Sequence, residues 1–171
     1  PFRYCSKERE QKNIMTSDLK IASLEVAKRS FVLLKNDKNI LPLKKDYKKI
    51  AIIGPLANSS LDPIGGWGGL GDSADVATVL EGFNNYVDSK TQILYSEGCK
   101  IDDQSTKGFK DAVNTAKKSD VIILCVGESR DMSGEACSRS SLDISGVQEE
   151  LAKELLKTGK PIVVVLMNGR P

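Results

Sequence analysis

The sequence predicts an α/β fold, a three-layer sandwich in which helices flank both faces of a mostly parallel sheet. Two observations support this prediction. From residue 50 onward, short apolar runs alternate with segments of helical periodicity, in the order strand, helix, strand, helix, strand, helix, strand. The 171 residues also suffice for one domain whose core buries roughly 70% of the unfolded surface. Because the last apolar run stands at the end of the chain, we expect the sandwich to be truncated there.

Each element follows from its local pattern. Strands are expected where apolar residues run together, at residues 50–54, 92–96, 121–126 and 162–167. Helices are expected between them, at residues 76–87, 105–118 and 146–158, because apolar residues recur there on one face. Ser105 is the expected N-cap of the second of these helices. Gly159 and Pro161 end the third helix before the last strand.

The first part of the chain has a different character. Residues 1–16 are polar and mixed, and they predict a linker or arm with Phe2 and Tyr4 as candidate anchors on another domain. Ser17 is the expected N-cap of a helix that runs to about residue 29. The predicted organisation is therefore a linker at residues 1–16 and an α/β sandwich at residues 17–171.

Composition excludes several classes of function. Lys and Arg total 25 and Asp and Glu total 23, so the net charge of +2 gives no reason to expect a nucleic-acid partner. Histidine is absent, which excludes a Ser-His-Asp triad, a Cys-His dyad and an HExxH zinc site within the chain. Any general acid or base must be a carboxylate, Lys, Tyr or Cys. No stretch approaches the ~20 apolar residues of a membrane span.

The four cysteines carry little functional signal. They form no CxxC pair, and no metal site is predicted. Cys125 lies within an apolar run, where a small buried thiol is the simplest interpretation. The count permits two disulfides without requiring them.

Two long loops leave the carboxyl ends of predicted strands, at residues 55–75 and 127–145. Binding loops of parallel sheets lie at that edge, and loops of this length are usually functional. The first loop places Trp67, the only tryptophan, among five glycines. Its ring either covers the sheet edge or stacks on a flat ligand such as a sugar or a base. A dinucleotide fingerprint is not met, because about twenty residues separate Gly54 from the next helix.

The second loop is rich in charge. It carries four carboxylates and two arginines, which are Glu128, Asp131, Glu135, Asp143, Arg130 and Arg139. Such a loop can be a solvated surface. Gly134 directly before Glu135 instead suggests a special backbone angle that aims this carboxylate. Cys137 has no histidine to activate it, so a catalytic thiol is disfavoured.

Residues 133–144 (SGEACSRSSLDI), followed by Gln148, resemble the acid/base loop of glycoside hydrolase family 3. Residues 159–171 resemble the segment after that loop in the family's bacterial β-glucosidases. Residues 27–36, 50–57 and 66–72 agree as well, and residues 1–4 resemble the linker that leaves the family's first domain. The resemblance thus covers nearly the whole chain in order.

The resemblance implies an architecture and an activity. In that family a (β/α)8-type barrel carries the aspartate nucleophile, and a second α/β sandwich with a six-stranded sheet supplies the acid/base glutamate. The chain then corresponds to the linker and an incomplete second domain of a retaining, exo-acting β-glucosidase-like enzyme that hydrolyses terminal β-linked sugars. Its expected partners are a carbohydrate substrate and the barrel of the same parent chain, without a cofactor. Alone, lacking the nucleophile, it is expected to be inactive.

The resemblance also assigns residues. Glu135 is the expected general acid/base, and Trp67 and Arg139 are the expected substrate-binding residues. Trp67 would form an aromatic wall on the aglycone side, and Arg139 would pair with a carboxylate and orient the loop. Asp143 would fix the turn before the last helix. The family's bacterial members suggest a periplasmic or secreted location.

Two other hypotheses remain open from the sequence. One is a non-catalytic carbohydrate-binding or structural α/β module whose cleft has lost its chemistry. The other is a Rossmann-like nucleotide binder, which the glycine-rich loop favours only weakly.

Overall fold

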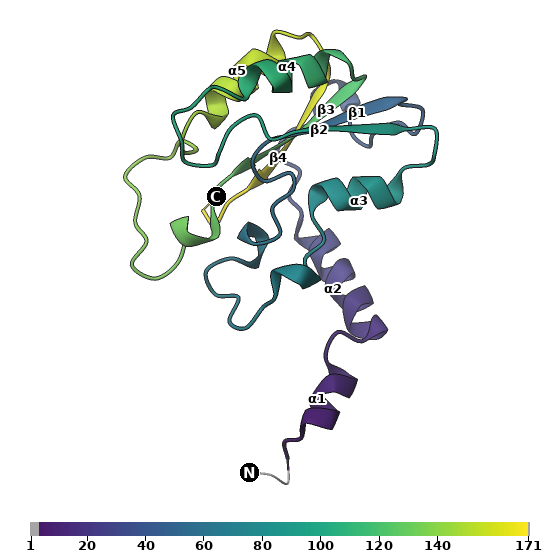
Figure 1. The fold of residues 1–171 in the computed structure, drawn as a ribbon, viewed down its shortest axis with the longest axis vertical. Coiled ribbons are helices and arrows are strands. Elements are labelled where there is room, and N and C mark those ends of the chain that lie inside the picture. The colour runs from purple at the N-terminus through teal and green to yellow at the C-terminus, as the bar shows by residue number, and fades with distance from the viewer. Residues whose placement is uncertain (1–3, 171) are drawn as a thin grey trace. The chain divides into compact units, whose positions relative to one another are not determined.

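A computed structural model describes residues 4–170, and the chain divides into two compact units, residues 1–41 and residues 42–171. The first unit contains helices α1 (Lys7–Asn13) and α2 (Ser17–Ser30) (Figure 1). The predicted linker therefore includes a short helix that its polar sequence did not indicate. The expected N-cap of α2 is wrong by one residue, because the Thr16 side chain accepts the hydrogen bond from Leu19 N–H and Ser17 is already helical. Phe2 lies outside the described residues.

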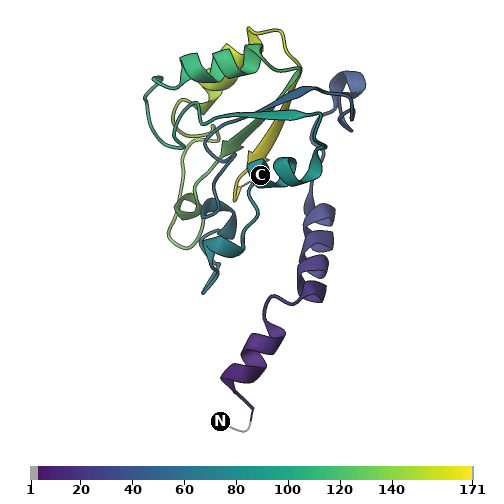
Figure 2. The same cartoon turned by 45° about the vertical axis from the view of Figure 1, so that its right-hand side comes forward.

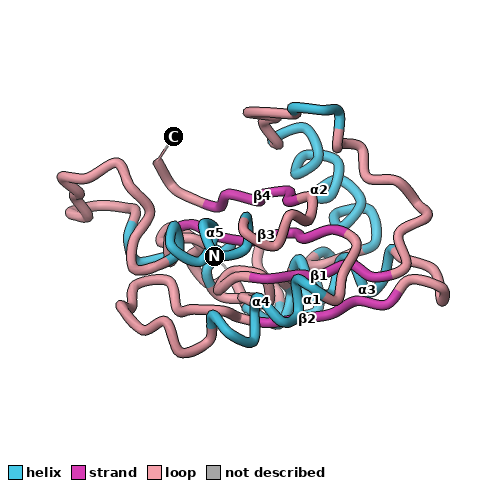
Figure 3. The backbone as a smooth tube through the Cα atoms, turned by 90° about the horizontal axis from the view of Figure 1, so that it is seen from above, coloured by secondary structure: helices cyan, strands magenta, loops and turns pink. Residues whose placement is uncertain are grey.

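The second unit is built on a four-stranded parallel sheet with strand order β2-β1-β3-β4 (Figure 3). Its strands are β1 (Lys49–Ile53), β2 (Gln92–Ser96), β3 (Val121–Gly127) and β4 (Ile162–Met167). All four predicted strands are confirmed, with ends that differ by at most one residue. β3 is buried along its whole length because it lies between β1 and β4 and is covered on both faces.

Helices cover the two faces of the sheet unequally. α4 (Phe109–Lys117) and α5 (Gln148–Leu156) lie on one face, and α3 (Val79–Tyr86) lies on the other (Figures 1 and 2). One core cluster joins Ala112, Leu151 and Leu155 to alternate residues of β1 and β3, and a second joins α3 to the residues between them. The predicted three-layer α/β class is confirmed.

The helix starts follow two different rules. Thr78 and Glu81 form a capping box at the start of α3, in which each side chain accepts from the other residue's backbone N–H. The expected cap Ser105 is wrong. α4 begins at Phe109 after Gly108, without a side-chain cap, and the Ser105 hydroxyl accepts from Lys107 N–H in a separate turn.

The strand order places the loops of interest together. β1 is followed along the chain by β2 on one side, whereas β3 joins β1 on its other side. The connections therefore diverge at the carboxyl ends of β1 and β3, the point at which open parallel sheets form binding crevices. Both long loops leave the sheet there. No helix among residues 4–170 is long and apolar enough to cross a membrane.

Candidate functional site

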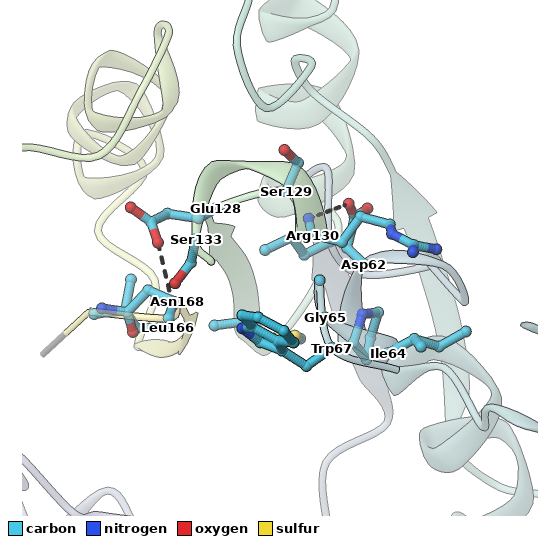
Figure 4. Close-up of a pocket in the computed structure, with 15 residues that line it drawn as sticks. Asp62, Ile64, Gly65, Trp67, Glu128, Ser129, Arg130, Ser133, Leu166 and Asn168 are labelled. Atoms are coloured by element: carbon cyan, nitrogen blue, oxygen red, sulfur yellow. Dashed lines mark hydrogen bonds between the residues drawn. The ribbon is translucent and has the colours of Figure 1, made fainter. Parts of the chain in front are cut away.

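The two long loops are tied together by Asp62, which lies in the first loop. Its Oδ1 accepts a hydrogen bond from Arg130 N–H of the second loop at 3.0 Å (Figure 4). Its Oδ2 accepts from the Ser59 hydroxyl at 2.6 Å. The carboxylate thus joins two segments that are 68 residues apart in sequence. Asp62 was not among the residues expected at the site, because nothing in its local sequence distinguishes it from a solvated turn residue.

A cavity of about 570 Å³ lies between the loops and the segment after β4. The first loop contributes Trp67, the second contributes Glu128 and Ser133, and the chain after β4 contributes Asn168 (Figure 4). Trp67 remains 76% exposed, so most of its ring is available to another molecule or domain. The structure therefore places Trp67 at the edge of a pocket and does not bury it in the sheet.

Glu135 stands at the exposed tip of the second loop. Gly134 before it has a φ of 144°, and Ala136 after it has a φ of 60°. Cys137 N–H closes the turn on the Gly134 carbonyl at 3.2 Å. The expectation of a special backbone angle at Gly134 is confirmed, since only glycine adopts this φ readily.

Trp67 and the Glu135 turn are neighbours. A Cβ built on Gly134 would lie 3.7 Å from Trp67 Nε1. The structure thus brings the residue before Glu135 close to Trp67, so that the two long loops meet at this turn. Arg139, the third predicted site residue, stands further along the second loop and faces inward.

The carboxylate of Glu128 is the buried charge of the site, with its side chain 7% exposed. Its Oε1 accepts from Arg139 at 2.9 Å and from Arg170 at 3.1 Å, and its Oε2 accepts from Gly169 N–H at 3.1 Å. Burial alone would raise the pKa of Glu128. The hydrogen bonds and the two positive charges outweigh this effect, so the pKa lies below its ordinary value.

The arginines that face Glu128 also hold the loop backbone. The second terminal nitrogen of Arg139 donates to the Asp143 carbonyl at 2.6 Å. The second terminal nitrogen of Arg170 donates to the carbonyls of Met132 at 2.6 Å and Cys137 at 2.7 Å. The expectation that Arg139 pairs with a carboxylate is confirmed, and Glu128 is the partner. We call Glu128, Arg139 and Arg170 the Glu128 cluster.

Two further polar residues shape the end of the loop. Asp143 accepts from the Ser141 hydroxyl at 2.9 Å, and its own N–H donates back to that hydroxyl, so it forms a local turn. Gln148 is fully buried at the start of α5, where it bonds to the backbone of Gly127. These contacts fix where the loop rejoins the helical layer.

The cysteine thiols have no catalytic part in the site, although the Cys137 backbone belongs to the Glu135 turn. All four are free thiols. Burial raises the pKa of Cys125 to about 12 and that of Cys99 to about 11, so both stay protonated at neutral pH. Cys137 donates its S–H to the Asp131 carbonyl at 3.3 Å. Within residues 4–170, no group of three or more His, Cys, Asp or Glu side chains could hold a metal ion.

Comparison with known proteins identifies the domain. The family model described as the glycosyl hydrolase family 3 C-terminal domain matches residues 31–171. A β-xylosidase of Formosa agariphila is 42% identical over 156 residues, which cover 87% of this chain and 21% of the relative. A periplasmic β-glucosidase of Salmonella typhimurium is 42% identical over 167 residues, which cover 86% of this chain and 22% of the relative. The chain thus spans about a fifth of the length of these curated relatives.

Solved structures agree with this match. A β-glucosidase from Listeria innocua superposes with a TM-score of 0.87 at 32% identity, over 100% of this chain and 23% of that one. An exo-β-xylosidase of glycoside hydrolase family 3, XlnD, superposes with a TM-score of 0.78 at 35% identity, over 88% of this chain and 19% of that one. The chain belongs to glycosyl hydrolase family 3, and residues 31–171 match the C-terminal domain of that family.

Proposed function

We propose that the chain is part of a larger retaining β-glycosidase, to which it supplies the general acid/base Glu135. In this proposal residues 1–16 are the linker from a barrel domain that carries the nucleophile, and residues 17–171 belong to the α/β sandwich. The similar proteins named β-xylosidase and β-glucosidase indicate terminal β-linked xylose or glucose as the substrate class. The Salmonella relative, named periplasmic, suggests a periplasmic or secreted location.

The chemistry needs only two carboxyl groups. A carboxylate of the barrel attacks the anomeric carbon, and the Glu135 carboxyl donates its proton to the leaving oxygen as the glycosidic bond breaks. Glu135, now a carboxylate, then takes a proton from the water that releases the sugar and so regenerates both groups. The absence of histidine is compatible with this mechanism.

The observation that supports the proposal is the position of Glu135. It is exposed, it stands between two residues of positive φ, and Gly134 directly before it lies close to the exposed ring of Trp67. A carboxyl at such a tip can reach a sugar bound by another domain. A general acid must carry its proton when the substrate binds, and burial between two domains disfavours a charged carboxylate.

Trp67 and Arg139 have different parts in this proposal. The exposed Trp67 ring stacks on the leaving group or the next sugar unit. Both terminal nitrogens of Arg139 already donate to protein groups, which favours a contribution to substrate binding through loop orientation.

The test is Glu135→Gln in the parent enzyme, assayed on aryl β-glycosides of graded leaving-group ability. We expect kcat/KM to fall by about 10²–10⁴-fold for a poor leaving group and far less for an activated one. Azide should restore turnover, since it replaces water as the nucleophile in the second step without needing a base. Asp131→Asn, an exposed carboxylate of the same loop, is the matched control. Unchanged turnover of the poor substrate by Glu135→Gln would contradict the assignment.

Two further measurements test the division of labour and the alternative of a nucleotide binder. The 171-residue chain alone should not hydrolyse any of these glycosides, and activity without the barrel would overturn the division of labour. Calorimetry with NAD or a nucleotide should show no binding, because β1 ends at Ile53 and α3 begins only at Val79, so no α-helix starts directly after the strand.

A further inference from the structure

We propose that Glu128 is the positioning residue for Glu135: through Arg139 and Arg170, its buried carboxylate holds the turn on which Glu135 stands. This inference rests on the proposed function and extends it to a residue that does not touch the substrate. It assigns the Glu128 cluster the task of fixing where the acid/base is presented.

The contacts of Arg170 form a clamp around the Glu135 turn. Its first terminal nitrogen donates to Glu128 Oε1 at 3.1 Å, and its second donates to the carbonyls of Met132 and Cys137 at 2.6 and 2.7 Å. These carbonyls lie on either side of Glu135 in the sequence. One guanidinium therefore draws both ends of the turn together and leaves Glu135 at its tip.

Arg139 holds the loop after the turn. It donates to Glu128 Oε1 at 2.9 Å and to the Asp143 carbonyl at 2.6 Å. Because both arginines meet at one carboxylate oxygen, they are held together by Glu128. Without that charge, two guanidinium groups would face each other in a half-buried site, and their repulsion would open the loop.

The cluster also connects the turn to the rigid part of the fold. Glu128 directly follows β3, and Gly169 N–H, which follows β4, donates to its Oε2. β3 and β4 are paired along six register positions. The Glu135 turn is thus anchored to two paired strands, and its position does not depend on contacts within the loop alone. Displacement of a catalytic group by about 1 Å can cost about 10²-fold in rate.

The test compares Glu128→Gln with Glu149→Gln in the parent enzyme. Glu149 makes an exposed ion pair with Lys153 on α5 at 2.9 Å and serves as the matched control. For Glu128→Gln we expect kcat/KM to fall about 10–100-fold on a poor leaving group and less than about threefold on an activated one. The control should match the wild type on both. If the substitution only reduced the folded fraction, kcat/KM would fall by the same factor for both substrates.

A second variant separates positioning from folding. Arg170→Lys keeps a positive charge near Glu128 but cannot donate to Met132 and Cys137 while it bonds the carboxylate. It should show the same dependence on the leaving group. Hydrogen exchange on the 171-residue chain should become faster in residues 131–143 for both variants and stay unchanged for Glu149→Gln.

The results that overturn the inference are distinct from those that overturn the proposed function. The positioning role would be overturned by an equal loss of kcat/KM on both substrates or by no loss on either. It would also be overturned by unchanged hydrogen exchange in the loop or by failure of both variants to fold. Failure of the acid/base assignment would show itself in Glu135→Gln alone. The exchange measurement would then still decide whether the Glu128 cluster holds the loop.

Discussion

Gln148 binds the backbone of Gly127 at both ends of its side-chain amide. Its Oε1 accepts from Gly127 N–H at 2.9 Å, and its Nε2 donates to the Gly127 carbonyl at 2.8 Å. The same Nε2 lies within hydrogen-bond distance of the carbonyls of Ile101 and Ser145, at 2.9 and 3.1 Å. One buried amide therefore connects the end of β3, the loop after β2 and the start of α5.

We expect Gln148→Leu to lower the free energy of unfolding by about 3 kcal/mol, because it leaves several buried backbone groups without a partner. Urea unfolding of the chain measures this. Gln104→Leu, at an exposed site, is the control and should change stability by less than about 0.5 kcal/mol. Equal effects of the two substitutions would contradict the role of Gln148.

The Glu128 carboxylate predicts a pH dependence of stability. Its pKa in the folded chain lies below the ordinary glutamate value of about 4.3, so its contribution is complete above that value and is lost as the pH falls through the folded pKa. Glu128→Gln should therefore be less stable by about 3 kcal/mol at neutral pH, and this difference should shrink steadily as the pH falls below about 4. Urea unfolding at a series of pH values checks it; a difference independent of pH would refute the ion-pair explanation.

Trp67 is predicted to bind the leaving-group side of the substrate and to contribute little to the stability of the fold. In the parent enzyme, Trp67→Ala should raise KM for a disaccharide about tenfold because one stacking contact is lost, while Trp67→Phe should keep most of the affinity. KM for a methyl glycoside should be unchanged, because its leaving group offers no ring for Trp67 to stack on. The melting temperature should stay the same because the side chain is 76% exposed. An equal rise of KM for both substrates would place Trp67 elsewhere.

Gly169 is predicted to be intolerant of a side chain. A Cβ at this position would lie 2.2 Å from Ser133 Oγ and 2.4 Å from Ser133 Cβ, so the loop that carries Glu135 must shift. Gly169→Ala should lower the free energy of unfolding by about 1–3 kcal/mol. In a Ser133→Gly background the same change should cost much less, and a double-mutant cycle by urea unfolding measures this coupling. Additive effects would contradict the steric explanation.

β4 is predicted to promote self-association of the chain. Within residues 4–170 it pairs with β3 alone, and its Val164 and Leu166 are 56% and 42% exposed. An apolar edge strand invites pairing with another copy. Sedimentation over a concentration series should show association that Val164→Lys reduces. A stable monomer of the unaltered chain would count against the prediction.

Secondary structure was predictable wherever burial imposes a pattern. The strands were located to within one residue because apolar runs in a buried parallel sheet leave little freedom of placement. The helix starts were less accurate, since Thr16 and Ser17 can both act as an N-cap and the choice depends on which backbone takes the extended conformation. α1 was missed because its short polar sequence shows no apolar face.

The candidate site was predictable in part. Glu135 and Trp67 were singled out by their loops and by a family resemblance, and the structure brings their loops into contact. Glu128 was only one of four carboxylates in a charged loop. Its burial depends on Arg170, which is 42 residues away and reaches it only because β4 pairs with β3. No local pattern carries that information.

By itself the sequence determined the α/β class, the strand positions and the two long loops that line the candidate site. Its lack of histidine also limits any general acid or base in the chain to a carboxylate, Lys, Tyr or Cys. These properties follow from hydrophobic periodicity and from which side chains are present. The tertiary structure alone decided the strand order, the convergence of the two loops, and the choice of Glu128 as the buried charge. These depend on contacts between residues far apart in sequence, and their free energies arise only when pairing of the strands brings the partners together and excludes water.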